Sequence, residues 1–437
     1  RVVDKPKDGW IDYAFKQAVH HLGPHWIPAF REGKVSFQRP SHLAAVLNEA
    51  GGRDALASLK RLLDGADLDR ATRSAAISAV LAVGGPDDLR TYGLDVKRFT
   101  RDGRYDASLH AESLGRLVEV TRFRKVRPAG DLVALLGGLI TTDHVQVQAR
   151  SLELAGLWNV TRIGDAILAA AGNDRLPVTV REAAFGALVA LKVPAGRGVL
   201  EASTTAPHPV ALRSAAVRSL VSIDPQLAAR RAAELFDGEK LSADDTTATL
   251  DAFMNRTGGA QSLAAAMKSK KLKPETARQL LKSLFSTGHS DRELLGTFNT
   301  ALGASAKAPD YNQQFVKKLA GDAAKSGVVT RGGVLFRDLA CVSCHKVGGS
   351  GGTIGPDLTA IGTTLSPERI VEELLWPNRQ VKEGFSVIQV VTADGKIHQG
   401  YQRKTKDSQA TGDLVRNPNE TLLLQALFLD LPTAEPA

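Results

Sequence analysis

Cysteine and methionine are both scarce in this chain of 437 residues, which contains two of each. Two cysteines cannot build the disulfide framework that holds a small secreted domain together. They are also too few for a structural zinc site, which needs four ligands and usually takes them from two Cys or His pairs. Both cysteines lie in one short segment, Cys341-Val342-Ser343-Cys344. The sulfur chemistry of the sequence is therefore concentrated at one place.

Aromatic residues make up only 5% of the chain, although its formal net charge is +9. The excess of Lys and Arg lies in residues 1–325, because residues 326–437 hold 11 basic against 12 acidic residues. Proteins that bind nucleic acids combine basic patches with aromatic side chains that stack on the bases. Here the basic residues are scattered along the sequence. We expect no nucleic-acid partner and interpret the basic residues as a solvated helical surface.

Long apolar runs are absent as well. No stretch approaches the roughly 18 consecutive apolar residues that a membrane helix needs, so we expect no membrane span. The sequence also contains no P-loop, dinucleotide fingerprint or nucleophile–base arrangement that would identify a class of enzyme. No catalytic residue is predicted.

The chain is rich in the pattern of amphipathic helices, which are separated by Gly, Pro, Asp and Asn over residues 40–325. Residues 180–188 match residues 212–220, which lie 32 positions later, and residues 147–152 carry a related pattern 33 positions before residue 180. Residues 73–77 repeat the same paired alanines. A repeat of this length is one helical hairpin, and stacked hairpins form a solenoid. We predict an all-α region that resembles HEAT repeats, with an irregular helical bundle as the alternative.

The composition changes near Thr330. A glycine-rich stretch, 348–352, is followed by a β-branched run at 385–391 and then by Asp394-Gly395, a strong signal for a hairpin turn. We therefore predict a mainly α chain in three parts. These are an N-terminal linker or capping segment at 1–39, a HEAT-like α-solenoid at 40–327, and a small domain with a β-hairpin insertion at 328–437.

The small domain carries the motif that points to chemistry. Cys341 and Cys344 are followed at once by His345, which is the Cys-x-x-Cys-His spacing of c-type haem attachment. Two cysteines on one helical turn can form thioethers with both haem vinyl groups, and the next histidine then faces the iron. A thioredoxin-like redox pair is the competing interpretation, but it needs a βαβ context. The motif predicts a c-type cytochrome domain with one covalent haem c and His345 as the proximal iron ligand.

Two flanking segments resemble class I cytochromes c. Residues 333–340 resemble their N-terminal helix, in which a phenylalanine, here Phe336, packs near the porphyrin. Gly355-Pro356-Asp357-Leu358 resembles the Gly-Pro-x-Leu segment of that family. The resemblance implies that the Pro356 carbonyl accepts a hydrogen bond from the proximal histidine, which orients the ring and raises its basicity. It also implies that Leu358 packs on the haem.

The second axial ligand of the iron is less evident. Class I cytochromes usually use a methionine downstream of the histidine, but the two methionines here, Met254 and Met267, both precede the motif. Their spacing from preceding leucines is that of a buried helical face. His398 is the only histidine after His345, so we keep it as a candidate distal ligand. Because it lies beside the predicted turn, an exposed strand residue is the alternative.

Residues 330–403 are also similar to a haem-binding domain typical of Planctomycetes and Verrucomicrobia. The similarity rests on the Cys-x-x-Cys-His motif, the Gly-Pro-x-Leu segment, Trp376-Pro377-Asn378, Gly384-Phe385 and Asp394-Gly395. In that family HEAT-like repeats and the cytochrome follow a sorbosone-dehydrogenase-like β-propeller. The resemblance implies that this chain is the part after the propeller. It also implies a bacterial protein that is periplasmic or secreted, because c-type haem is attached outside the cytoplasm in these families.

These features predict electron transfer through a monohaem c domain carried on an α-solenoid. The expected partners are a dehydrogenase domain or protein as electron donor, and an electron acceptor. Two alternatives stay open: a haem enzyme of peroxidase type, and a scaffold whose solenoid binds a protein partner. The electron-transfer part of an oxidoreductase is favoured over a catalyst that acts by itself.

Overall fold

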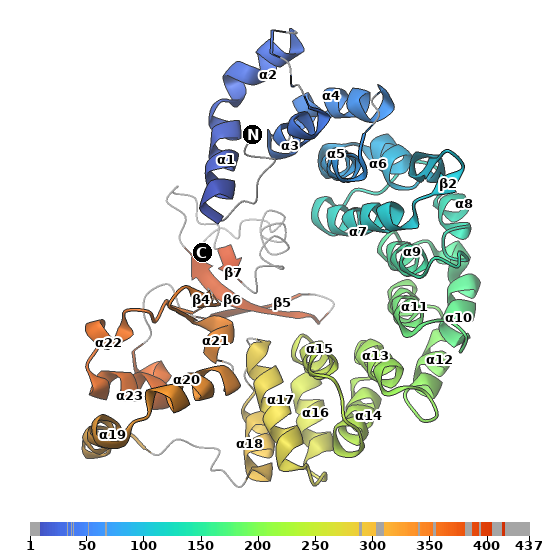
Figure 1. Ribbon diagram of the computed structural model, residues 1–437. Coiled ribbons are helices and arrows are strands. Elements are labelled where there is room, and N and C mark those ends of the chain that lie inside the picture. The colour runs from blue at the N-terminus through green and yellow to red at the C-terminus, as the bar shows by residue number, and fades with distance from the viewer. Residues whose placement is uncertain are drawn as a thin grey trace, which may run out of the picture. The chain divides into compact units, whose positions relative to one another are not determined.

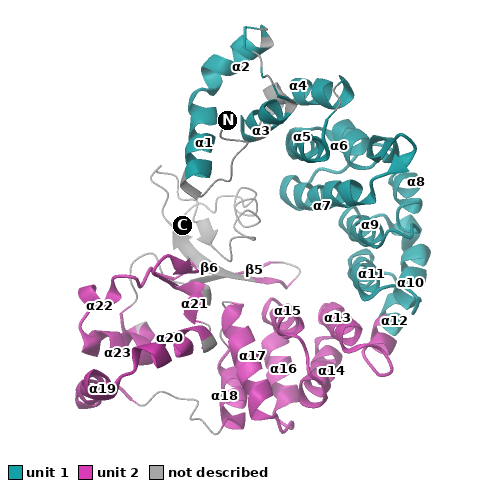
Figure 2. Cartoon of the chain, in the orientation of Figure 1, with its two compact units in different colours: residues 1–199 teal, residues 200–437 magenta. Residues whose placement is uncertain are grey.

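The structure of the protein is a computed structural model. It describes residues 9–32, 34–35, 37, 39–50, 52–65, 68–287, 291–302, 310–339, 341–352, 355–380, 387–392, 395–403 and 413–415. The described chain is mainly α-helical, as the sequence predicted, and contains few strands (Figure 1). It divides into two compact units, Arg1–Val199 and Leu200–Ala437 (Figure 2). The domain limits predicted after residues 39 and 327 stay predictions.

Unit 1 contains most of the N-terminal helices and one short hairpin. Its helices are α1 (Gly9–His21), α2 (Gly23–Arg31), α3 (Pro40–Ala50), α4 (Gly52–Gly65), α5 (Arg70–Val83), α6 (Pro86–Gly93), α7 (Ala107–Arg124), α8 (Leu132–Gly137), α9 (Val145–Leu157), α10 (Gly164–Gly172) and α11 (Val178–Leu191). Two 3-10 helices, η2 (Val96–Phe99) and η3 (Thr161–Ile163), and strands β1 (Thr100–Arg101) and β2 (Arg104–Tyr105) complete it. Helix α12 (Gly196–Ser203) contains the limit between the units.

Helices in unit 1 pack against the second helix that follows them in the chain. Thus α5 packs on α7, α7 on α9, and α9 on α11. The approach of α9 to α11 is close, because a Cβ added to Gly156 would lie 3.2 Å from the Cα of Ala187. Leu152 and Phe185 are fully buried in this packing. The repeated segments found in the sequence all lie in these helices or in α13, so their predicted helical structure is confirmed.

Carboxylates cap several helices and explain where they begin. Asp69 accepts a hydrogen bond from the backbone N–H of Thr72 at 2.9 Å at the start of α5. Asp106 does the same for Leu109 at 2.8 Å at the start of α7. Such caps satisfy backbone N–H groups that have no partner within the helix.

Unit 2 contains the remaining helices and most of the strands. Its helices are α13 (Val210–Leu220), α14 (Pro225–Gly238), α15 (Ala243–Met254), α16 (Gly259–Met267), α17 (Pro274–Ser286), α18 (Arg292–Ala301), α19 (Gln313–Ser326), α20 (Val329–Asp338), α21 (Cys341–Cys344), α22 (Ile361–Thr364), α23 (Pro367–Leu375) and the 3-10 helix η4 (Pro377–Arg379). Its strands are β3 (Lys346–Val347), β4 (Ser350–Gly351), β5 (Val387–Val391), β6 (Ile397–Arg403) and β7 (Asp413–Val415).

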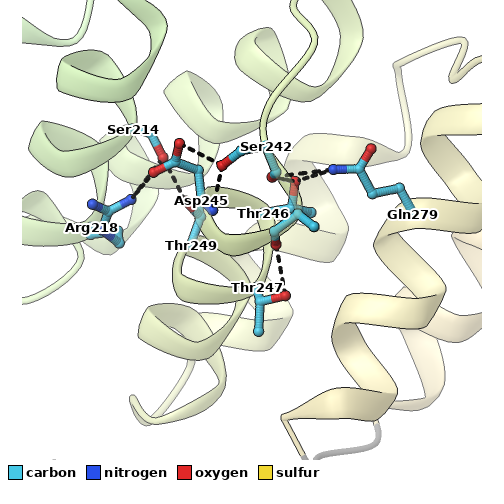
Figure 3. A network of polar contacts seen from close by, with 9 residues as sticks. Ser214, Arg218, Ser242, Asp245, Thr246, Thr247, Thr249 and Gln279 are labelled. Atoms are coloured by element: carbon cyan, nitrogen blue, oxygen red, sulfur yellow. Dashed lines mark hydrogen bonds and ion pairs between the residues drawn. The ribbon is translucent and has the colours of Figure 1, made fainter. Parts of the chain in front are cut away.

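A row of polar side chains joins α13, α15 and α17 of unit 2 (Figure 3). Ser214 and Thr249, both fully buried, share a hydrogen bond of 2.9 Å between their hydroxyl oxygens. The side-chain amide of Gln279 donates to Thr246 Oγ1 at 2.7 Å and also to two backbone carbonyls before α15. Because buried polar groups are costly without partners, these bonds specify how the three helices pair.

The predicted C-terminal hairpin is present. Strands β5 and β6 pair antiparallel, with Val387 opposite Tyr401 and Val391 opposite Ile397, and β7 pairs with the other edge of β6. Gly395 in the turn has φ of +79°, which glycine adopts without strain. Of the predicted turn pair, Asp394 lies outside the described residues, as do residues 385 and 386 of the β-branched run.

The hairpin is anchored to the connection between α15 and α16. The backbone N–H of Thr257 donates to the carbonyl of Gly395 at 3.0 Å, and the N–H of Ile397 donates to the carbonyl of Asn255 at 2.9 Å. The C-terminal hairpin and these helices therefore share backbone hydrogen bonds within one unit.

One expectation about the N-terminal region was wrong. Residues 40–325 were predicted to be all-α, but Thr100–Arg101 and Arg104–Tyr105 pair antiparallel between α6 and α7. The cause is local: Asp102 and Gly103 have φ of 48° and 73°, the left-handed values of a tight hairpin turn. The Asp-Gly signal was present, but charged residues flank it where a hairpin strand usually alternates apolar and polar residues.

Candidate haem-binding site

The two cysteines and the histidine share one helical turn. Helix α21 consists of Cys341–Cys344, and the backbone N–H of His345 donates to the carbonyl of Cys341 at 2.9 Å. This bond extends the turn by one residue. The spacing predicted from the sequence is thus realised as a helical turn, which presents Cys341, Cys344 and His345 from neighbouring positions.

A glycine-rich loop folds back over this turn. The N–H of Gly352 donates to the carbonyl of Val342 at 2.9 Å, and the N–H of Gly355 donates to the carbonyl of Cys344 at 2.8 Å. Gly351 has φ of +120°, and a Cβ there would overlap the carbonyl oxygen of His345. The loop therefore needs glycine both for its backbone conformation and for its close approach to the motif.

The imidazole of His345 is held from two sides. Its Nδ1 lies 2.9 Å from the carbonyl oxygen of Pro356. Because a carbonyl can only accept, Nδ1 carries a proton, and in the neutral imidazole Nε2 then keeps its lone pair. Gly355 packs against the ring so closely that an added Cβ would lie 2.6 Å from Cε1 and 2.7 Å from Nδ1. His345 is therefore oriented with Nε2 available to a metal.

Both cysteines are free and half-buried, and they form no disulfide. Burial raises the pKa of the Cys344 thiol, and the neighbouring Cys341 raises it further. A redox-active cysteine of the thioredoxin type depends on a lowered pKa, which makes the thiolate available near neutral pH. The raised pKa of Cys344 is the opposite of what a thioredoxin-like pair needs, so this alternative loses support.

The surroundings of the motif are apolar but not buried. Among the described side chains from Gly321 onward, none is buried, whereas α13 to α18 each bury several. Leu335 of α20 and Leu339, which directly follows this helix, are 46% and 58% exposed, and Val347 is 44% exposed. Large apolar side chains of a soluble domain normally pack against a core. A large, flat, apolar group attached at the two cysteines would give this segment its core, so the residues present fit a haem.

The other predicted contact residues flank the motif. Phe336 is half-buried on α20, the helix directly before the cysteines. Leu358 is half-buried, and its N–H donates to the carbonyl of Lys346 at 2.8 Å, directly after His345. The structure thus brings together Cys341, Cys344, His345 and Pro356, with Phe336 and Leu358 on the adjoining segments.

His398 and the methionines do not join this arrangement. His398 lies on β6 opposite Val390, and its side chain is outside what the structure describes, so distal ligation by His398 stays a prediction. Met254 and Met267 are 7% and 0% exposed on α15 and α16, which confirms that they belong to the helical core.

The roles of Gly351 and Gly355 were not predicted from the sequence. The signal that could have revealed them is the number of glycines between His345 and Pro356, where residues 348–352 were described only as glycine-rich. Close backbone approach to an imidazole is a further reason for glycine at such positions.

Among the described residues, no three His, Cys, Asp or Glu side chains come together as ligands for a bare metal ion. Likewise, none of the helices that the structure describes combines the length and apolar character that crossing a membrane requires.

Comparisons of the chain with protein-family models, with curated proteins and with solved structures found no significant match.

Proposed function

We propose that residues 328–437 form a c-type cytochrome domain that transfers electrons through one covalent haem. The observation that carries the proposal is the hydrogen bond of 2.9 Å from His345 Nδ1 to the Pro356 carbonyl, directly after a Cys-x-x-Cys turn. It places the donor hydrogen on Nδ1 and leaves Nε2 as the nitrogen that can ligate iron.

In this proposal each residue has a distinct task. Cys341 and Cys344 hold the haem through thioethers, and Nε2 of His345 is the proximal ligand. Pro356 orients the imidazole and raises its basicity, which favours the oxidised iron. Phe336 and Leu358 shield the site from water, which also influences the reduction potential. The haem, when bound, supplies a one-electron redox centre, and the polypeptide sets its position and potential.

We propose further that residues 40–327 form a HEAT-like α-solenoid that carries the cytochrome domain. The packing of each helix on the second helix after it, seen for α5, α7, α9 and α11 and again for α13, α15 and α17, supports this interpretation. A solenoid surface is suited to binding a protein partner. The partners proposed here are a dehydrogenase domain or protein as electron donor, and an electron acceptor.

The resemblance to the Planctomycetes and Verrucomicrobia domain supports a bacterial, periplasmic or secreted location. It also supports placing the chain after a sorbosone-dehydrogenase-like propeller. Both remain part of the proposal.

A redox titration followed by visible absorption tests the proposal. A single one-electron wave with a low-spin, six-coordinate spectrum is the result expected of an electron-transfer domain. The His345→Ala variant should keep its haem through the cysteines, while its Soret band shifts and weakens. Its far-UV helix signal should change little, because most helices lie before residue 328. Absence of any one-electron wave in the haem-loaded protein would contradict electron transfer.

A peroxidase-like haem enzyme is the second candidate. It is favoured by one observation, that both methionines of the chain are buried in helices before the motif. A five-coordinate, high-spin spectrum together with rapid reaction with hydrogen peroxide would support this candidate over electron transfer.

A further inference from the structure

A second candidate site lies in unit 1, in a hollow of about 410 Å³ between α5, η2, the β1–β2 hairpin and the start of α7. Six of the side chains that line it are cationic and one is a carboxylate. They are Arg70, Arg73, Lys97, Arg98, Arg101, Arg104 and Asp106. Residues that are scattered in the sequence are therefore gathered by the fold into one positive surface.

Three of the six cations have carboxylate partners. Arg70 contacts Glu112 at 2.7 Å and Asp106 at 3.2 Å, and Arg98 pairs with Asp64 of α4. Arg101 lies 3.8 Å from the carboxylate of the adjacent Asp102. These ion pairs fix part of the rim without neutralising the hollow.

The other three cations are Arg73 on α5, Lys97 on η2 and Arg104 on β2. Their side chains form no ion pair or hydrogen bond with any residue that the structure describes. Arginines on nearby helices of unit 1 are paired: Arg122 with Glu153 at 2.6 Å, for example, and Arg116 with Glu119 at 2.6 Å. Unpaired cations gathered in a hollow repel one another, and a bound anion would relieve that repulsion.

The hairpin that carries Arg101 and Arg104 is held firmly at its base. The N–H of Asp106 donates to the carbonyl of Phe99 at 2.7 Å. The ring of Phe99 stacks on buried His110 with 4.1 Å between centroids, and the Tyr105 hydroxyl lies 2.7 Å from His110 Nδ1. Because Phe99 precedes the hairpin and Tyr105 ends it, His110 fixes both of its ends. The backbone of the hairpin is thus fixed before any ligand arrives, which lowers the entropic cost of binding.

We propose that this hollow binds a compact multivalent oxyanion, presented as a phosphate or sulfate ester. Guanidinium groups are planar donors that match tetrahedral oxyanions with two parallel hydrogen bonds, and five of the six cations in the hollow are arginines. The volume is that of a small-molecule site. The proposal does not depend on the haem.

Calorimetric titration of the full chain tests the site, with inorganic tripolyphosphate and a trisulfated disaccharide as probes. Binding of at least one probe at low salt is expected, and it should weaken as the salt concentration rises. Each charge-assisted hydrogen bond contributes enough that Lys97→Gln with Arg104→Gln should lower the affinity about tenfold or more. Arg73→Gln alters a cation that α5 contributes and should independently weaken binding of the same probe.

The matched control is the double variant Arg127→Gln with Arg162→Gln. Both residues are exposed cations of unit 1 outside the hollow, so the affinity should stay within about twofold of the unmodified protein. Far-UV circular dichroism checks that every variant is folded. A preference for tripolyphosphate identifies a phosphate ester, and a preference for the disaccharide identifies a sulfate ester. Failure of both probes to bind at low salt, or equal losses in the hollow and control variants, would overturn the proposal.

Discussion

His345 Nδ1 and the carbonyl oxygen of Pro356 lie 2.9 Å apart, although the two residues are eleven positions apart in the sequence. The bond closes the glycine-rich loop over the Cys-x-x-Cys turn and assigns the imidazole proton to Nδ1. Its acceptor is a backbone carbonyl, so replacing the Pro356 side chain does not remove the acceptor. The geometry is more directly tested at Gly355, which packs against the same ring.

Gly355→Ala should displace the imidazole, because the new methyl carbon would lie 2.6 Å from Cε1. Overpacking of this kind costs about 1–3 kcal/mol of stability. Weakening the bond to Pro356 would also make His345 less basic, so the reduction potential of the haem-loaded protein should rise. Thermal unfolding and a redox titration measure the two effects.

Gly362→Ala is the matched control for this substitution. Gly362 lies on α22, and nothing is within 4 Å of the position its Cβ would take. Stability and potential should therefore stay near those of the unmodified protein. Equal effects at Gly355 and Gly362 would show that Gly355 does not position the histidine.

Much of this site could be predicted from the sequence because its parts are close together in the chain. A helical turn fixes how Cys341, Cys344 and His345 lie relative to one another, and the Gly-Pro-x-Leu segment follows within a short loop. The lack of buried side chains among the residues described from Gly321 onward could not be predicted, since exposure depends on what packs on each side chain in space. For the same reason the distal ligand is not assigned by sequence spacing.

Gln279→Leu should destabilise unit 2. The amide of Gln279 donates to Thr246 Oγ1 at 2.7 Å and to the carbonyls of Leu241 at 3.1 Å and Ser242 at 3.2 Å. Leucine would leave Thr246 Oγ1 and the Leu241 carbonyl without the Gln279 donor, whereas the Ser242 carbonyl would still accept from Thr246. Loss of a donor to a buried acceptor costs about 1–3 kcal/mol. Urea unfolding followed by far-UV circular dichroism measures the loss.

Gln261→Leu is the matched control. Because position 261 is exposed on α16, this substitution should change stability by no more than about 0.5 kcal/mol. A loss at position 279 no larger than at 261 would mean that this network contributes nothing to stability.

The helical repeats illustrate what periodicity can and cannot predict. The alanine-rich segments at 73–77, 147–152, 180–188 and 212–220 were correctly predicted to be helical, since their apolar residues recur at helical spacing. The gathering of Arg73, Lys97 and Arg104 into one hollow was not predicted. Charges on different elements have no common period, so only the fold brings them together.

Unit 1 should lose stability as the pH falls from about 6.5 toward 4. Burial lowers the pKa of His110 to about 4, against the opposing influence of a Gly93 backbone hydrogen bond and the Asp95 charge. In the unfolded chain His110 takes up a proton near pH 6.5, whereas in folded unit 1 it takes one up only near pH 4. Protons therefore favour the unfolded state across this window, by up to about 3 kcal/mol at its lower end.

The pH dependence of urea unfolding isolates the contribution of His110. His110→Gln removes the titrating group, so its unfolding free energy should vary less between pH 6.5 and 4 than that of the unmodified protein. His25→Gln, at an exposed position on α2, should leave the pH profile unchanged. If the His110→Gln and unmodified profiles run parallel, burial of a neutral His110 is not what sets the acid sensitivity.

Covalent attachment of haem is checked by the pyridine haemochrome spectrum of the denatured chain, produced in a host that attaches c-type haem. Two thioethers at Cys341 and Cys344 should keep one haem on each polypeptide through acid–acetone extraction, with the absorption maximum of a c-type haemochrome. Replacing both cysteines by alanine should release the haem under the same conditions. Complete extraction of haem from the unmodified chain, or no haem at all, would contradict the account.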